Sequence, residues 1–191
     1  MSAGILLLAL LLDYCIGWPD QLFQRIGHPV TWLGRLINVL EQRFNARSET
    51  TRFAGRCFGL LTLFIVALLS GGIGWWLQQF FAESSWFWLI GAVAAWPWIA
   101  MRSMKEHVEA VAAPLTHQQL PEARYAVSMI VGRNPDNLDE TGVARAALES
   151  LAENTSDGVI APLFWALLCG LPGLFLYKSV NTLDSMIGHR N

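Results

Sequence analysis

The chain has 191 residues, of which 53% are hydrophobic and only 15% are charged. Soluble domains carry about 25% charged residues, so this composition argues against an ordinary soluble domain and favours a membrane protein. The formal net charge of −2 gives no reason to expect a nucleic-acid partner. The three cysteines lie far apart, in or beside apolar runs, and support neither a disulfide framework nor a zinc site.

The first three apolar runs are candidate membrane segments. The run at 3–18 is short and contains Asp13, but it lacks the basic start and the cleavage site of a signal peptide. We therefore expect it to be retained in the membrane. Residues 57–77 contain no ionisable side chain except a thiol, and residues 84–101 contain none. Both runs approach the length of about 20 residues that a helix needs to cross a bilayer.

The last apolar run, residues 159–177, contains Pro162, Gly170 and Pro172, which break or kink a helix. A continuous span here would place the polar segments before and after it on opposite sides of the membrane. We instead expect a broken, re-entrant hairpin that returns the chain to its side of entry, with protein covering its non-helical backbone.

Basic residues predict the orientation. Residues 19–56 hold six arginines and residues 102–158 hold five basic groups, whereas the connection 78–83 holds none. The two long connections should therefore lie in the cytoplasm. We expect an all-α, multi-pass integral protein of the inner (cytoplasmic) membrane, with a single membrane domain over residues 1–191 and amphipathic cytoplasmic helices.

Tryptophans cluster towards the ends of the two long apolar runs, as an aromatic belt at a membrane boundary requires, although core packing is an equal alternative. They are Trp75, Trp76, Trp86, Trp88, Trp96 and Trp98. Within the first connection, apolar residues recur at helical spacing from Val30 to Phe44, which predicts a helix on the membrane surface. His28 stands at its entrance, either as a titratable group or as a loop histidine packed against the helix start.

The second connection predicts three helices. The first carries an apolar stripe over residues 104–115, the second starts at Pro121, and Asp139 caps the third. Leu138 and Val143 have the spacing of a hydrophobic staple around that cap. The expected buried face of the third helix comprises Val143, Ala147 and Leu151, flanked by Ala144 and Leu148.

The third helix ends in ESLAENTSDG, which places carboxylates at Glu149, Glu153 and Asp157. If the helix continues that far, they share one stripe, and like charges at this spacing cost about 0.2 to 0.5 kcal/mol per pair. Two interpretations stay open. The segment could be a helix stop whose charges face water, or its oxygens could collect a hard divalent cation such as magnesium with nucleotide phosphates.

A second polar segment, YKSVNTLDSM, follows the last apolar run. It combines an ammonium, an amide and a carboxylate at Lys178, Asn181 and Asp184. Polar groups at a membrane edge are costly unless they are paired or functional, so this segment is a second candidate for a binding site.

Several motifs together resemble one family. They are LLDYCIGWPD, GHPVTWLGRLI, IVGRNPDNLDETGVARAALESLAENTSDGVIAPLFWALLCGLPG and YKSVNTLDSMIGHRN. In this order they are similar to the membrane-bound adenosylcobinamide-phosphate synthases of cobalamin biosynthesis, the CobD/CbiB family. Members of this family continue past the last motif, so the resemblance implies that the 191 residues cover the N-terminal portion of the family domain.

The resemblance implies an ATP-dependent ligase that joins aminopropanol, or its phosphate, to the free propionate of adenosylcobyric acid. It implies ATP and Mg²⁺ as cofactors. The partners would be the corrinoid, the amino alcohol, the lipid bilayer and other membrane-bound enzymes of the late pathway. The implied metal ligands are Glu149, Asp157 and Asp184, and the catalytic candidates are Glu153, Asp139 and His28. The implied cofactor-binding residues are Arg133, Asn154, Lys178 and Asn181.

Two other classes stay open. A related membrane branch is linked to β-lactamase induction signalling, which would make the protein a sensor without turnover. A corrinoid or ion transporter could also use broken helices and intramembrane carboxylates.

Overall fold

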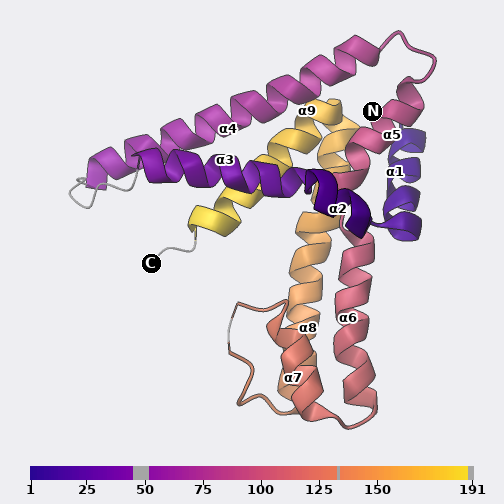
Figure 1. Ribbon diagram of the computed structural model, residues 1–191, viewed down its shortest axis with the longest axis vertical. Coiled ribbons are helices and arrows are strands. Elements are labelled where there is room, and N and C mark those ends of the chain that lie inside the picture. Colours follow the sequence, from indigo (N-terminus) through magenta and orange to yellow (C-terminus); the bar gives the residue numbers. More distant parts are fainter. Residues whose placement is uncertain (45–51, 133, 189–191) are drawn as a thin grey trace. The chain divides into compact units, whose positions relative to one another are not determined.

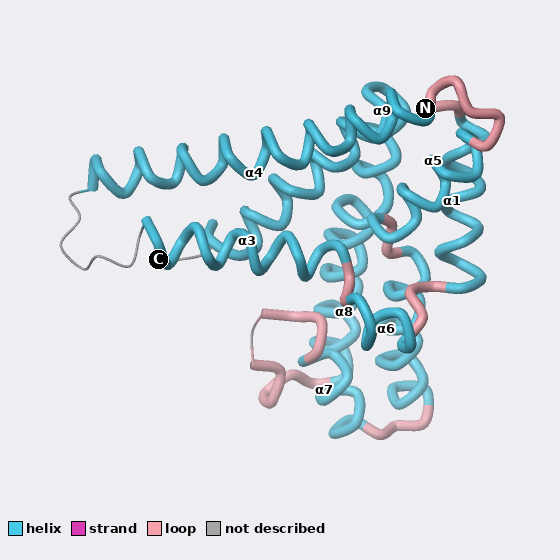
Figure 2. The backbone as a smooth tube through the Cα atoms, turned by 45° about the horizontal axis from the view of Figure 1, so that its top comes forward, coloured by secondary structure: helices cyan, strands magenta, loops and turns pink. Residues whose placement is uncertain are grey.

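The computed structural model describes residues 1–44, 52–132 and 134–188. Every regular element in these ranges is a helix, which confirms the all-α prediction (Figure 2). The chain divides into two compact units. The first unit comprises Met1–Ile99 and Ala161–Asn191, and the second comprises Ala100–Ile160.

The first unit contains six α-helices and two short helical turns (Figure 1). They are α1 (Ala3–Ile16), α2 (Asp20–Ile26), α3 (Pro29–Phe44), α4 (Arg52–Phe81), α5 (Phe87–Ala95), the 3₁₀ turn η1 (Trp96–Trp98), α9 (Ala161–Leu183) and the π-helical η3 (Asp184–Gly188). The second unit contains α6 (Met101–Thr116), α7 (Leu120–Ser128), α8 (Glu140–Thr155) and the π-helical η2 (Ser156–Ile160).

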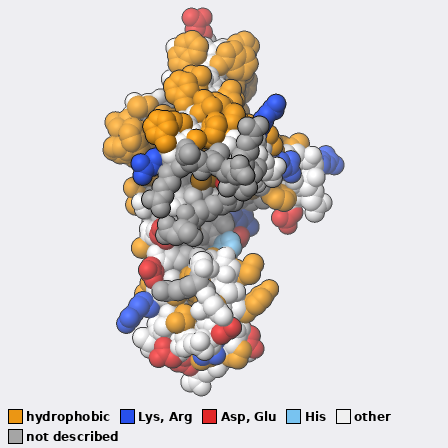
Figure 3. Space-filling view, turned by 90° about the vertical axis from the view of Figure 1, so that its left-hand side faces the viewer, with side chains coloured by type: hydrophobic (Ala, Val, Ile, Leu, Met, Phe, Trp, Pro, Cys, Tyr) orange, Lys and Arg blue, Asp and Glu red, His pale blue; other side chains and the backbone are white. Residues whose placement is uncertain are grey.

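Two described helical stretches are long and apolar enough to cross a membrane, Phe53–Phe81 and a window within Glu140–Gly188. A third candidate is the pair Ala3–Ile16 and Asp20–Phe44, which is bent by 103°. The run predicted at 57–77 therefore lies within one spanning-length helix, α4. Figure 3 shows hydrophobic side chains crowded on the surface of the first unit, where α4 exposes large residues such as Phe53, Leu60 and Phe64.

The run at 84–101 does not form one spanning helix, so that prediction is wrong. Helix α5 has nine residues, and the Trp96–Trp98 turn follows it. The chain then becomes extended at Ile99. Pro97 explains the break, because its ring removes an N–H and crowds the carbonyl one turn earlier. Trp86 and Trp88 are exposed, as a belt requires, whereas Trp96 and Trp98 are half-buried.

The last apolar run reverses direction inside α9. Gly170 has φ 70° and ψ −154°, which are not helical angles. A Cβ added to Gly173 would lie 2.5 Å from the Trp165 carbonyl oxygen, whereas eight residues of continuous helix span about 12 Å. The half of α9 after Gly170 therefore turns back, as Figure 1 shows. The break predicted at Gly170 is present, with Pro172 two residues after it. Pro162 lies in the first turn of α9, where proline is tolerated. Re-entry from the cytoplasmic side stays a prediction.

Helix α4 covers this reversal. The Leu171 N–H donates a hydrogen bond to Gln78 Oε1 (3.0 Å), which replaces a helical acceptor that the break removes. A Cβ added to Gly74 would lie 2.8 Å from Leu171 backbone atoms, so the two backbones touch. Near the other end of α9, the buried Ser179 hydroxyl lies 2.6 Å from Ser70 Oγ. Polar groups thus join two otherwise apolar helices.

Helix α3 confirms the amphipathic helix predicted from Val30 to Phe44. Its Leu33 and Ile37 form a buried cluster with Val66 of α4 and Leu183 of α9. This cluster holds α3 against the returning half of α9 and so places the start of α3 near the polar end of that helix.

The second unit has the three helices that the sequence predicts. Asp139 is the N-cap of α8, and its Oδ1 accepts a hydrogen bond from the Gly142 N–H (2.7 Å). The buried core of this unit consists of Val111, Ala123, Val127, Val143, Ala146 and Ala147. The predicted face of α8 is partly wrong, because Leu148 is 65% exposed while Ser150 is buried.

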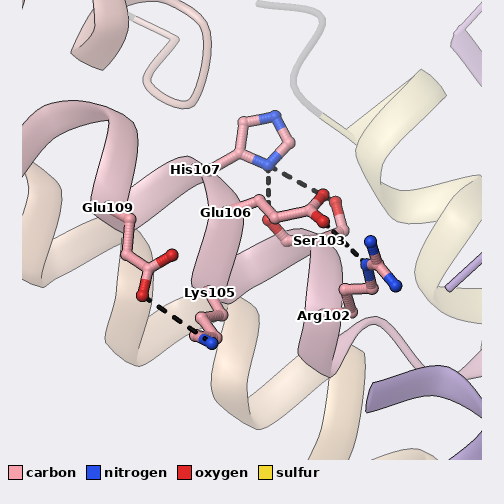
Figure 4. Close-up of polar contacts among 6 residues, drawn as sticks. All are labelled: Arg102, Ser103, Lys105, Glu106, His107 and Glu109. Atoms are coloured by element: carbon pink, nitrogen blue, oxygen red, sulfur yellow. Dashed lines mark hydrogen bonds and ion pairs between the residues drawn. The ribbon is translucent and has the colours of Figure 1, made fainter. Parts of the chain in front are cut away.

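The outer face of α6 is polar (Figure 4). Arg102 Nε lies 2.7 Å from Glu106 Oε1, and Lys105 Nζ lies 3.8 Å from Glu109 Oε1. Exposed pairs at this spacing contribute about 0.3 to 0.5 kcal/mol each, so they support the helix only slightly. His107 Nδ1 lies 2.6 Å from the Ser103 carbonyl oxygen of the same helix.

Candidate functional site

Two glutamates of α8 line a pocket within the second unit. Glu149 and Glu153 border a cavity of about 250 Å³. The other lining residues come from α8 and from the segment after α7, namely Ile130, Val131, Gly132, Ala146 and Ser150. Two carboxylates one turn apart on a concave surface form an arrangement that attracts a cation.

Ser150 shapes the wall of this pocket. Its hydroxyl donates a hydrogen bond to the Ile130 carbonyl oxygen (2.8 Å), which ties α8 to the segment after α7. Asn154 Nδ2 donates to the Ser150 carbonyl oxygen (2.9 Å) and lies 3.1 Å from the Ser150 hydroxyl. The amide of Asn154 is therefore held against its own helix beside Glu153, and its role in cofactor binding stays a prediction.

Helix α8 does not stop at ENTSDG. Neither Asn154 nor Gly158 has the positive φ typical of a helix C-cap, and the chain continues through the π-helical Ser156–Ile160. The Ala100 N–H donates to the Gly158 carbonyl oxygen (3.0 Å), which anchors this segment. The interpretation of the segment as a helix stop is therefore wrong. Asp157 lies in the π-helical segment, a kind of element often found at functional sites, rather than among the residues that line the pocket.

The acidic pocket fits magnesium only in part. Among the described residues, no three His, Cys, Asp or Glu side chains gather as a group that could hold a metal. Magnesium commonly uses one or two protein carboxylates and completes its shell with water and substrate phosphates. The pocket offers two carboxylates, of which Glu149 is a predicted metal ligand and Glu153 a predicted catalytic residue. The predicted ligands Glu149, Asp157 and Asp184 are drawn from both units, and their use as one set stays a prediction.

His28 caps the start of α3. Its carbonyl oxygen accepts from the Trp32 N–H (3.2 Å), and its Nδ1 accepts from the Val30 N–H (3.2 Å). Thr31 Oγ1 accepts from the His28 N–H (3.2 Å), in the manner of a capping box. Pro29 fits the first helical position, where an N–H would have no partner. With Nδ1 accepting, the neutral ring carries its proton on Nε2 and presents a donor there.

Aromatic rings and a cation surround His28 within the first unit. The Trp18 ring lies 5.0 Å from the His28 ring, edge to face, and 5.6 Å from the Trp96 ring. Burial, followed by the positive charge of Lys178, holds the pKa of His28 below its ordinary value of 6.5. The structure therefore places Lys178 within electrostatic range of His28, although these two predicted site residues are 150 positions apart in sequence.

The pKa of His28 predicts how stability depends on pH. The unfolded chain binds a proton near pH 6.5, before the folded chain does, so stability is lost as the pH falls below that value. We expect the Tm of the detergent-solubilised protein to drop between pH 7 and pH 5. His28→Asn should reduce this drop, because asparagine can cap α3 without titrating. An equal drop in both proteins would contradict the assignment.

The NTLDSM segment forms the end of α9 and the start of η3. Lys178, Asn181 and Asp184 are spaced by three residues, and such positions are neighbours on a helix surface. Asp184 begins the π-helical η3, and its carboxylate lies so close to Gly188 that an added Cβ there would meet Asp184 Oδ1 at 2.5 Å. The segment thus presents an ammonium, an amide and a carboxylate in a row.

Asp139 and Arg133 are the two remaining predicted site residues. Asp139 already uses its carboxylate to cap α8, which explains an aspartate there without a catalytic role, and that role stays a prediction. Arg133 lies outside the described residues.

Sequence reasoning missed Trp18, Trp96 and Ser150 as site residues. Trp18 belongs to the GWPD motif. The segments GWPD, GHP and WPW each place an aromatic ring directly before a proline, and this recurrence was a usable signal. Ser150 could have been found as a hydroxyl on the buried face of an amphipathic helix, where it needs an acceptor.

The fold and these clusters define an all-α protein with helices long and apolar enough to cross a membrane and with polar groups gathered at helix starts and π-helical segments. The family model described as "CobD/Cbib protein" matches residues 6–191. The chain belongs to this family.

Several curated relatives carry the name cobalamin biosynthesis protein CobD. The chain is 51% identical to that of Rhodobacter capsulatus over 98% of its own length and 59% of the relative's. It is 48% identical to that of Brucella anthropi, over 98% of the chain and 57% of the relative. It is 44% identical to that of Rhizobium meliloti, over 100% and 59%. The chain therefore spans less than two thirds of these relatives, and no solved structure matches it.

Proposed function

We propose that this protein serves cobalamin biosynthesis as an ATP-dependent amide ligase. It would join aminopropanol, or its phosphate ester, to the free propionate of adenosylcobyric acid, giving cobinamide or cobinamide phosphate. Membership of the CobD/Cbib family and the printed name of its relatives support the pathway. The observation that supports the proposed reaction type is that two carboxylates, Glu149 and Glu153, line one pocket.

The chemistry explains why such groups are needed. A carboxylate is a poor acyl donor because its resonance must be broken and oxide is a poor leaving group. Bound ATP with Mg²⁺ would supply a phosphate leaving group for the carboxylate. The amine nitrogen then bonds to the acyl carbon, the bond to the leaving oxygen breaks, and the nitrogen releases a proton that a base must accept.

We assign roles to the residues of each unit. In the second unit, Glu149 and Asp157 would hold the metal, and Glu153 would accept the proton of the amine. His28, in the first unit, is a weaker candidate base, because its Nδ1 already accepts a hydrogen bond from the Val30 N–H. Its Nε2–H suits the role of a hydrogen-bond donor. Asn154 and Arg133 would contact the nucleotide.

In the first unit, Lys178 and Asn181 would contact phosphate oxygens, and Asp184 would be a further metal ligand. We place the protein in the inner membrane with these groups on the cytoplasmic side. The corrinoid, the amino alcohol, the bilayer and other late-pathway membrane enzymes would be its partners.

Corrinoid-dependent ATP hydrolysis by the purified protein tests this proposal. We expect ADP release to require both adenosylcobyric acid and the amine, with the amide product detected by mass spectrometry. A parallel assay with aminopropanol and its phosphate identifies the preferred amine. Corrinoid binding without ADP release or amide would overturn the ligase and favour a sensor or a transporter.

A further inference from the structure

Two tryptophan N–H groups lie buried without a hydrogen-bond partner in the first unit. They are Nε1 of Trp18 and Nε1 of Trp96, the only two such side-chain atoms among the described residues. Their rings adjoin each other, with centroids 5.6 Å apart. A buried donor without an acceptor costs about 1 to 3 kcal/mol, so two in one cluster require an explanation.

The neighbouring groups are donors as well. His28 stands 5.0 Å from Trp18, ring centre to ring centre, and presents Nε2–H because its Nδ1 accepts from the backbone. Lys178 lies close enough for its charge to act on the His28 ring. The buried carboxylate of Asp13 does not accept from either indole, since neither N–H has a partner among the described residues. The rings of Trp18, Trp96 and His28 therefore gather three N–H donors, and the Lys178 ammonium lies within electrostatic range of His28.

We propose that Trp18, Trp96, His28 and Lys178 form a binding site for an oxyanion, the oxygen of a phosphate or a carboxylate. An oxyanion accepts several hydrogen bonds at once, and charge-assisted bonds of this kind are the strong ones. The four side chains are partly exposed, whereas the two indole N–H groups are buried. A ligand would therefore reach these N–H groups only after small rotamer changes, which are common at interfaces.

The backbone explains why these side chains meet. Gly17 and Gly27 have positive φ values of 63° and 76°, and they bracket α2 with sharp turns. Trp18 and His28 directly follow these two turns, Trp96 opens the 3₁₀ turn after α5, and Lys178 lies on the returning half of α9. The positions are therefore set by rigid helix ends rather than by long loops.

The identity of the oxyanion rests on the proposed function, whereas the site itself does not. In a ligase it would be a phosphate of ATP, the phosphate of the amino alcohol or the propionate of the corrinoid. A phospholipid headgroup is another source of the same chemistry. Separate titrations with each kind of oxyanion distinguish these sources.

The test follows the indole N–H signals by NMR. The 191-residue protein, labelled with ¹⁵N-tryptophan and held in a maltoside detergent that lacks phosphate, contains nine tryptophans. We expect two of the nine indole signals to shift on addition of inorganic phosphate and not of chloride, and Trp18→Phe and Trp96→Phe each to remove one of them. Absence of a shift in every arm, or an equal shift with chloride, would overturn the proposal.

Further arms identify the source. Acetate, ATP without magnesium and aminopropyl phosphate replace inorganic phosphate in separate titrations, and a nanodisc of phosphatidylglycerol tests the lipid. Lys178→Met should weaken phosphate binding at least about tenfold, because it removes the charged donor. The matched control Trp86→Phe changes a tryptophan that is 62% exposed in the same unit and should leave binding unchanged.

The two proposals fail separately. Amide formation in a protein whose indole signals ignore every oxyanion would retain the ligase and remove this site. Two shifting signals in a protein that forms no amide would retain the site and remove the ligase.

Discussion

Replacing Glu153 with glutamine is expected to lower amide formation by roughly 100-fold or more, the lower end of what a positioned acid or base contributes. Glu153 lines the pocket of α8 and is exposed, so the substitution removes a charge and a proton acceptor without opening a cavity in the core. Surface changes of this kind usually alter stability by less than about 0.5 kcal/mol. The measurement is the rate of amide formation with saturating ATP, corrinoid and amine.

The control for this substitution is Glu140→Gln. Glu140 lies in the first turn of the same helix and does not line the pocket, so its replacement should leave the rate unchanged. Tm values of both variants should stay close to that of the parent protein. Undiminished amide formation by the Glu153 variant would remove this residue from the site, and an equal loss in both variants would point to α8 as a whole.

Replacing Gly170 with alanine is expected to destabilise the first unit by about 2 kcal/mol or more, since a backbone region open almost only to glycine costs about 1 to 3 kcal/mol for other residues. Gly170 has φ 70° and ψ −154°, and an added Cβ would overlap the Gln78 side chain. Gln78 would have to move, and its hydrogen bond from the Leu171 N–H would be lost. The reversal of α9 would then lose both its turn and its cover.

Unfolding in detergent, followed by Tm, measures this effect. Gly72→Ala is the matched control, because an added Cβ there meets no atom within 4 Å and alanine favours a helix over glycine by about 1 kcal/mol. We expect a lower Tm for the Gly170 variant and an unchanged or higher Tm for the control. A Gly170 variant as stable as the control would show that the reversal does not depend on this glycine.

Local signals in the sequence were sufficient for most helices. The apolar period predicted α3, Asp139 predicted the cap of α8, and Pro121 predicted the start of α7. Each depends on residues close together in the chain, so no tertiary contact is needed to recognise it. The same local patterns overestimated the run at 84–101, where length and apolarity favoured a span that Pro97 divides.

The site was only partly visible from the sequence. Glu149 and Glu153 were recognisable because their spacing is that of one helical turn, and they do line one pocket. The pocket also needs Ile130 and Ser150, which a single hydrogen bond brings together across 20 positions. No periodicity encodes such a contact.

The sequence by itself determined the all-α class, the membrane character and the family of this protein, because composition, helical period and long motifs are properties of consecutive residues. Only the tertiary structure decided that the Trp18 ring lies against His28 and Trp96, that the charge of Lys178 reaches His28, and that α9 turns back beneath Gln78. Those meetings depend on where turns such as Gly17, Gly27 and Gly170 send the chain, and a small change in backbone angles at a turn moves everything that follows.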